Sequence, residues 1–96
     1  MLLGNINAQL IFEKIKKQEI YKNDRFHVLL LSMKEGEFLK PHQSLTDAFL
    51  FMIDGEILFI INKDEFHLIK GDEFTFKANE THSVKAIKNA AFLLVK

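Results

Sequence analysis

The sequence has no cysteine, no tryptophan and only one proline among its 96 residues. The lack of cysteine excludes a disulfide framework and thiolate metal ligands, and it suits a reducing compartment. Thirteen basic residues balance thirteen acidic ones, so we expect no basic surface that could follow a nucleic-acid backbone. The longest apolar run, Ala48 to Ile53, is far too short to span a bilayer. We therefore expect a cytoplasmic protein that binds neither nucleic acid nor membrane.

The residues that the chain does have favour a dense core rather than disorder. Hydrophobic residues make up 48% of the sequence, and ten of them are phenylalanine. A phenylalanine ring brings a large apolar area to a core without a polar atom that needs a partner. Disordered chains combine low hydrophobicity with high net charge, and this chain has neither. Its length leaves room for one domain, which we expect to span residues 1–96.

From Arg25 onward, short apolar segments alternate with turn residues, which is typical of an all-β sandwich or barrel. No interval between these segments is long enough for the crossover helix that a parallel sheet requires. Residues 1–24 show no clean helical or strand period, so we expect an extended arm or an edge strand there, and a barrel core over residues 25–96. The expected strands are Phe26–Met33, Ala48–Ile53, Ile57–Ile61, Glu65–Ile69, Phe74–Phe76, Val84–Ile87 and Ala91–Val95.

The dipeptide Asp54-Gly55 lies between two apolar runs and predicts a tight β-hairpin, because both residue types tolerate a positive φ angle. In the strand before it, Phe49 and Phe51 on one face alternate with Leu50 and Met52 on the other. One face can line a barrel, but the other then needs a cover. We expect a second copy of the chain to supply it in a symmetric homodimer, or else the N-terminal segment to fold back over it.

Four histidines are the main chemical candidates, because the sequence has no phosphate-binding loop and no serine nucleophile motif. His42 follows Pro41, and a proline cannot donate to a strand ladder, so His42 is expected at a strand end or sheet edge. His82 comes shortly after a turn, and both side chains are expected at the mouth of the barrel, where small-molecule sites form. His67 lies in a predicted strand without any motif, and we expect it to face solvent.

The spacing of residues around these histidines resembles the two sequence motifs of the cupin superfamily. The first motif is Gly, five residues, His-x-His, three or four residues, Glu, six residues and Gly, and its positions here are Gly36, His42, Ser44, Ala48 and Gly55. The second is Gly, five residues, Pro-x-Gly, two residues, His, three residues and Asn, and it falls on Gly71, Lys77, Asn79, His82 and Ala86. The resemblance covers residues 25–96 and implies a small antiparallel β-barrel, the double-stranded β-helix or jelly roll.

Cupins with a complete site hold a divalent metal ion with three histidines and one glutamate, and this chain resembles them at only two of these four positions. His42 and His82 are kept, whereas Ser44 is a poor ligand and Ala48 offers no donor atom. Metal sites of this kind normally need at least three protein ligands. We therefore expect no bound cofactor, with a weak divalent transition-metal site at His42 and His82 as the alternative.

The resemblance implies two classes of function, a binding protein and an enzyme. For the binding protein no catalytic residue is assigned. We expect a small-molecule binding protein rather than an enzyme, with its ligand in a barrel lined by His42, Ser44, Leu50, Met52 and His82. The alternative is a metal-dependent dioxygenase or isomerase, in which Gln43 and Asp47 would help to rebuild the site around His42 and His82. A metal-free enzyme of the epimerase type would use His42 as a general base. A third possibility is a scaffold whose phenylalanines fill the barrel completely.

Overall fold

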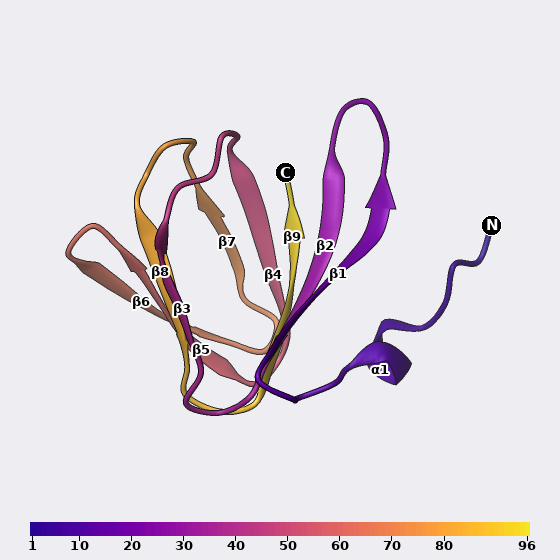
Figure 1. Ribbon diagram of the computed structural model, residues 1–96, viewed down its shortest axis with the longest axis horizontal. Coiled ribbons are helices and arrows are strands. Elements are labelled where there is room, and N and C mark those ends of the chain that lie inside the picture. Colours follow the sequence, from indigo (N-terminus) through magenta and orange to yellow (C-terminus); the bar gives the residue numbers. More distant parts are fainter.

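The computed structural model describes residues 1–96 as two antiparallel sheets that face each other (Figure 1). The five-stranded sheet has the order β1-β2-β9-β4-β7, and the four-stranded sheet has the order β3-β8-β5-β6. The predicted all-β jelly-roll class is confirmed. In chain order, the elements are α1 (Ile6–Gln9), β1 (Ile15–Lys22), β2 (His27–Met33), β3 (Phe38–His42), β4 (Ala48–Asp54), β5 (Glu56–Ile61), β6 (Asp64–Ile69), β7 (Glu73–Phe76), β8 (His82–Ala86) and β9 (Ala90–Val95).

All seven predicted strands are present, as β2 and β4 to β9, to within about two residues at each end. Two further strands are present: β3, which was not assigned from the sequence, and β1, which is the edge-strand alternative expected within residues 1–24. Strand β3 carries Lys40 and Pro41, and only one of its five residues is even partly buried, so it shows no apolar run. Strand β1 lies at the edge of the five-stranded sheet, where it pairs with β2 only. Edge strands are half solvated, and this blurs the alternation that marks a strand in a sequence.

The predicted hairpin at Asp54-Gly55 is wrong, because the two strands that it joins belong to different sheets. Strand β4 pairs with β7 and β9, whereas β5 pairs with β6 and β8. A tight turn is nevertheless present, since Gly55 has a φ of 77° and its N–H donates to Asp54 Oδ1 over 2.9 Å. A turn motif reports the local path of the backbone. It does not report whether the flanking strands then pair or separate into two layers.

The core fills the space between the inner faces of the two sheets. Alternation along each strand supplies it, and burying one large aliphatic or aromatic side chain contributes about 1.5–3 kcal/mol. Leu50, Met52 and Ile57 are fully buried, and Phe59 and Phe92 are nearly so. The cluster consists of Leu29, Leu31, Met33, Ala48, Leu50, Met52, Ile57, Phe59, Ile61, Leu68, Phe76, Val84, Ala86, Ala90 and Phe92.

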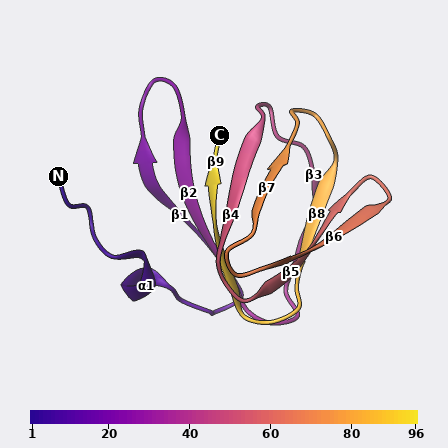
Figure 2. The same ribbon diagram turned by 180° about the vertical axis from the view of Figure 1, so that it is seen from behind.

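The outer face of the five-stranded sheet is covered only in part. Phe49 is 38% exposed, and Phe51 and Ile53 are half-buried. Helix α1 lies outside the sandwich, with Asn7 in the same surface hollow as Phe51 and Ile53, and the chain before it extends away from the body (Figure 2). The N-terminal segment thus covers one end of this face, and the homodimer stays a prediction. No helix of the structure has the length and apolar character needed to cross a membrane.

Gly55 also allows the closest approach between two backbone segments at the base of the sandwich. A Cβ atom placed on Gly55 would lie 1.9 Å from the Asn89 carbonyl oxygen and 2.6 Å from Ala90 Cα. Gly71 has a similar φ of 91°, yet a Cβ atom there would meet nothing within 4 Å. The two glycines therefore separate the effect of backbone conformation from the effect of close packing.

We expect Gly71→Ala to lower the free energy of unfolding by about 1–2 kcal/mol, because alanine is strained at positive φ. We expect Gly55→Ala to lower it by about 3 kcal/mol or more, since the methyl group must also displace the backbone of residues 89 and 90. Urea denaturation of both variants measures the two values. Equal losses in the two proteins would contradict a packing role for Gly55.

Candidate functional site

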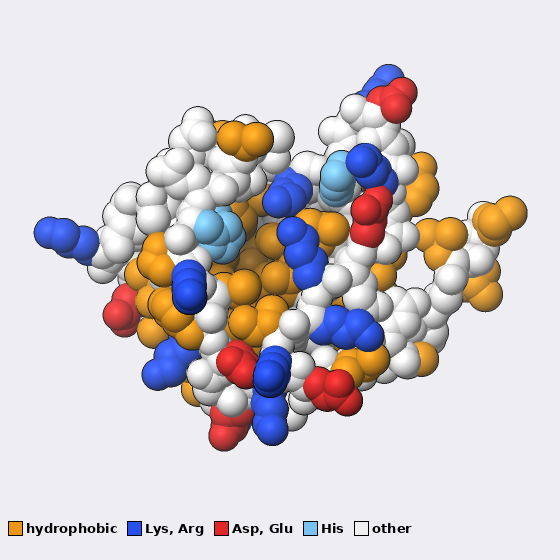
Figure 3. Space-filling view, in the orientation of Figure 1, with side chains coloured by type: hydrophobic (Ala, Val, Ile, Leu, Met, Phe, Trp, Pro, Cys, Tyr) orange, Lys and Arg blue, Asp and Glu red, His pale blue; other side chains and the backbone are white.

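One partly enclosed, mainly apolar cavity of about 140 Å³ lies between the two sheets. We call it the inter-sheet cavity. Figure 3 looks into a hollow with a hydrophobic floor, with a histidine on one side and Lys or Arg side chains on the other. Seven of its eleven lining residues are hydrophobic, and none is acidic. The lining consists of Lys17, Leu31, Leu39, His42, Phe59, Phe76, His82, Val84, Phe92, Leu94 and Lys96.

His82, on β8, forms part of the wall and is only 4% exposed. Its ring stacks on Phe59, with centroids 5.5 Å apart and planes at 12°, and it lies 4.5 Å from the ring of Phe76. Burial lowers the pKa of His82, and so do the nearby charges of His42 and Lys96, against the opposing effect of its hydrogen bond to the Glu80 carbonyl. The imidazole is therefore neutral at neutral pH.

The hydrogen bond to Glu80 also decides which ring nitrogen of His82 is available. The Nδ1 atom lies 2.9 Å from the Glu80 carbonyl oxygen. A carbonyl only accepts, so in the neutral ring Nδ1 carries the proton and donates it. The other nitrogen, Nε2, then keeps its lone pair as an acceptor. His42 has the same arrangement, since its Nδ1 lies 2.8 Å from the Lys40 carbonyl oxygen.

The fold brings His42 and His82 together, as the motif spacing implies. They are direct partners in the antiparallel pairing of β3 with β8, so their side chains share one face of the sheet. The two rings meet edge to face, with centroids 4.2 Å apart and planes at 63°. His42 is exposed and His82 is buried, so this histidine pair runs from the cavity mouth inward.

The other predicted lining residues lie elsewhere. Leu50 and Met52 are fully buried in the core and do not line the inter-sheet cavity. Ser44 is 7% exposed and also lies outside the lining, in the loop after β3. Its carbonyl accepts a hydrogen bond of 2.8 Å from the Asn79 N–H, and its hydroxyl accepts one of 3.4 Å from the Thr46 N–H. Ser44 therefore joins two loops.

The two proposed helper residues are engaged in loop contacts as well. Asp47 Oδ1 accepts a hydrogen bond of 2.9 Å from the Ala78 N–H, and Gln43 Nε2 donates one of 3.1 Å to Thr81 Oγ1. Both contacts tie the loop before β4 to the loop between β7 and β8. Neither side chain lines the inter-sheet cavity.

The donor set of the inter-sheet cavity does not fit a divalent metal ion. No group of three or more His, Cys, Asp or Glu side chains converges on one point anywhere in the structure. The histidine pair offers two imidazole nitrogens, whereas metal sites of this kind use at least three protein ligands. Lys17 and Lys96 line the same cavity and add positive charge where a cation would have to sit.

These two lysines are the site residues that the sequence analysis missed. Lys17 lies on β1, in the segment expected to be either an extended arm or an edge strand, and Lys96 follows the last residue of β9. The signal was present in β9, because Phe92, Leu94 and Lys96 follow one another at alternate positions and all line the cavity. Burial lowers the pKa of Lys96, and the positive charge of Lys17 lowers it further.

A larger hollow of about 580 Å³ lies between the β1–β2 turn and the loop after β3. Only two of its eleven lining residues are hydrophobic, and it is much more open than the inter-sheet cavity. Lys96 lines both spaces, so this hollow adjoins the mouth of the cavity. It is more open and more polar than is usual for a small-molecule site.

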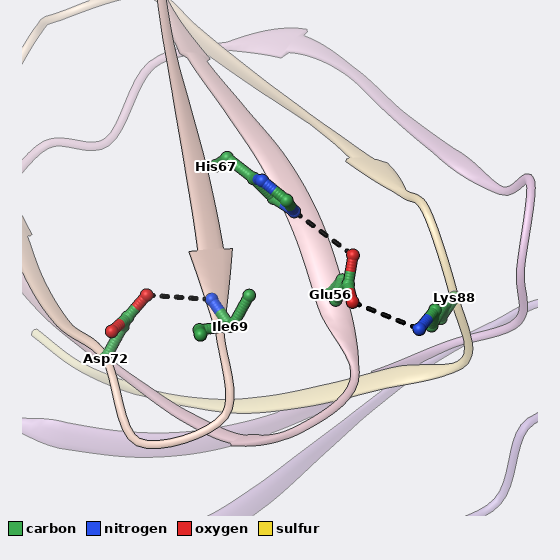
Figure 4. A network of polar contacts seen from close by, with 5 residues as sticks. All are labelled: Glu56, His67, Ile69, Asp72 and Lys88. Carbon is green, nitrogen blue, oxygen red and sulfur yellow. Dashed lines mark hydrogen bonds and ion pairs between the residues drawn. The ribbon is translucent and has the colours of Figure 1, made fainter.

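His67 belongs to a separate surface network on the four-stranded sheet (Figure 4). Its Nε2 lies 3.1 Å from one carboxylate oxygen of Glu56, and Lys88 Nζ lies 3.1 Å from the other. The contacts with Lys88 and then with His67 lower the pKa of Glu56. Nearby, Asp72 Oδ2 accepts a hydrogen bond of 2.8 Å from the Ile69 N–H. The side chain of His67 is 56% exposed, as expected for a surface residue.

The buried position of His82 predicts how stability depends on pH. Its pKa is lowered in the folded protein, so the unfolded chain takes up this proton at higher pH than the folded chain does. The free energy of unfolding is therefore not reduced by His82 above the unfolded pKa of about 6.5, and it falls as the pH drops below that value. We expect urea denaturation between pH 7 and pH 5 to show that the free energy of unfolding falls more steeply with decreasing pH in the wild type than in His82→Asn. The difference in slope should correspond to the uptake of up to about one proton on unfolding. His67→Asn is the control and should keep the wild-type slope. A His82→Asn variant that also keeps the wild-type slope would show that His82 does not cause the loss of stability.

Comparison with known proteins gives matches at the level of three-dimensional structure alone. No model of a protein family matches the sequence, and no curated protein does. An RmlC-like cupin from Desulfovibrio desulfuricans superposes with a TM-score of 0.88 at 16% identity, over 99% of this chain and 94% of that one. A cupin superfamily protein from Desulfitobacterium hafniense superposes with a TM-score of 0.83 at 16% identity, over 90% of this chain and 79% of that one.

A third structure is somewhat nearer in sequence. The cupin 2 conserved barrel domain protein from Leptotrichia buccalis has a TM-score of 0.88 and 25% identity, over 96% of this chain and 46% of that one. The matches thus extend over almost the whole chain, including β1, and not only over the region that carries the two motifs. The chain therefore has the fold of the cupin superfamily, and its structure is similar to those of small conserved-barrel and RmlC-like cupins.

Proposed function

We propose that this protein binds a small organic molecule in the inter-sheet cavity, without a metal ion. The observation that carries the proposal is a partly enclosed, mainly apolar cavity that contains a few polar groups. Sites for small molecules commonly combine these two features, since apolar contacts supply affinity and the polar groups set orientation. A scaffold with a completely filled barrel would have no such cavity.

The polar groups of the cavity suit a ligand that carries a hydrogen-bond donor. Each imidazole of the histidine pair donates through Nδ1 to a backbone carbonyl, which leaves Nε2 free to accept. The ring of His82 is held by stacking on Phe59, so its acceptor has a fixed direction. A preorganised acceptor loses little side-chain entropy when a ligand binds.

The size of the cavity limits the part of the ligand that it can enclose. Its volume is about 140 Å³. An apolar cavity of about 150 Å³ holds a molecule the size of benzene. We therefore infer a ligand with a compact apolar body of about this size, whose polar end points toward the mouth and the histidine pair.

The ligand-binding prediction uses benzyl alcohol as the probe. We expect it to shift the NMR signals of the His42 and His82 imidazoles in the wild type, with affinity in the millimolar range. Leu39 lines the cavity, and Leu39→Trp should abolish the shifts because the larger side chain fills the space. Phe38 precedes Leu39 in β3 and points to the other face, so Phe38→Trp should leave the shifts unchanged. Shifts that persist in Leu39→Trp, or none in the wild type, would count against this site.

The metal prediction is tested with protein purified without a histidine tag. We expect calorimetric titration with Zn²⁺, Ni²⁺, Fe²⁺ or Mn²⁺ to detect no stoichiometric binding, because two imidazoles beside two lysines make a poor cation site. His42→Ala is the matched variant, since it removes one of the two nitrogen donors. Stoichiometric binding that disappears in His42→Ala would overturn this prediction and favour the metal-dependent enzyme instead.

A further inference from the structure

Lys17 and Lys96 give the inter-sheet cavity a charge that the histidine pair does not explain. Both lysines belong to the five-stranded sheet, whereas the histidine pair lies on the four-stranded sheet that faces it. Their inward direction follows from strand geometry. Lys17 is paired with Leu31, a core residue that also lines the cavity, and Lys96 continues the inward series of Phe92 and Leu94.

The backbone of Lys96 is fixed in this position. Its N–H donates to the His27 carbonyl over 2.9 Å, and its carbonyl accepts from the His27 N–H over 2.6 Å. This reciprocal pair continues the β2–β9 ladder by one residue. The aliphatic stem of such a lysine can lie along an apolar wall while its ammonium group reaches the mouth.

Neither lysine forms an ion pair with an acidic side chain. Both ion pairs of the protein involve Glu56, which lies on the other sheet, so neither lysine has an acidic partner within 4 Å. None of the eleven residues that line the cavity is acidic, and Glu19, the next residue on the same face of β1, is not among them. Two uncompensated positive charges near one apolar space repel each other, and they also repel any cation that approaches. An anion would relieve this repulsion.

We propose that the ligand of the inter-sheet cavity is a small organic anion, with a carboxylate held by Lys17 and Lys96 and a compact apolar body enclosed by the aromatic wall. This inference rests on the proposed function and names its ligand class. The charge comes from the lysines rather than from His82, because the neutral ring of His82 donates through Nδ1 and presents Nε2 as an acceptor. The apolar body follows from the seven hydrophobic lining residues, which inorganic anions would leave without a partner.

Three probes of nearly equal size and different charge test the assignment: benzoate, benzamide and benzylammonium. NMR titration at low ionic strength measures the affinity of each for the intact chain. We expect benzoate to bind about tenfold more tightly than benzamide, because hydrogen bonds to charged groups are stronger than those between neutral groups. We expect benzylammonium to bind most weakly, and added salt to weaken benzoate more than benzamide.

Matched variants identify the residues responsible. Lys17→Gln and Lys96→Gln should each weaken benzoate binding by about tenfold and change benzamide binding by less than about twofold. Lys16 and Lys17 are both exposed, but Lys16 points to the other face of β1 and does not line the cavity, so Lys16→Gln is the control and should bind benzoate as the wild type does. Thermal unfolding of all three variants shows whether each is folded.

The possible outcomes separate this inference from the proposed function. Equal binding of all three probes, abolished by Leu39→Trp, would overturn the anion assignment and leave the small-molecule site in place. Benzoate binding that is unaffected by Lys17→Gln and Lys96→Gln would also overturn it. If no probe binds and the spectra of the wild type stay unchanged, both the anion assignment and the proposed function fail.

Discussion

The packing of Phe59 connects the core of this protein to its site. Phe59 lies on β5 and is 1% exposed, with ring centroids 5.0 Å from both Phe74 and Phe76. Its other contact is the stacked ring of His82. The same side chain thus holds the two sheets together and sets the direction of the histidine that faces the cavity. A cavity can persist beside this cluster because aromatic rings are stiff and lock one another in place.

The chemistry of the cavity follows from what its walls supply. A metal-binding barrel needs several donors that converge on one point, whereas this barrel has two imidazoles on one sheet and two ammonium groups on the other. Both imidazoles are held by backbone carbonyls, so they act as directed acceptors. Positive charge without an acidic partner favours an anion over a cation. The fold is that of the cupin superfamily, yet the proposed site offers two lysines and two histidines instead of a full set of metal ligands.

Sequence reasoning worked where a local pattern has one structural meaning. Short apolar runs between turn residues yielded seven strands, and the spacing of glycines and histidines placed His42 beside His82. It failed where the outcome depends on distant partners. The turn at Gly55 is real, but β4 pairs with β9, whose partner residues lie 37 to 46 positions further along the chain, instead of with β5. Leu50 and Met52 point inward as alternation predicts, yet they lie in the core rather than at the cavity.

The sequence by itself determined the all-β class and the location of the histidine pair, because strand alternation and turn geometry are local properties of the chain. Tertiary structure alone decided which residues share the cavity. Lys17 and Lys96 lie 79 positions apart, and only the β1-β2-β9 order of the sheet brings their strands close together. An inward side chain packs in the core where the two sheets lie close together, and it lines a cavity where they are further apart. That separation is a property of the packed sheets, which no single segment of the chain encodes.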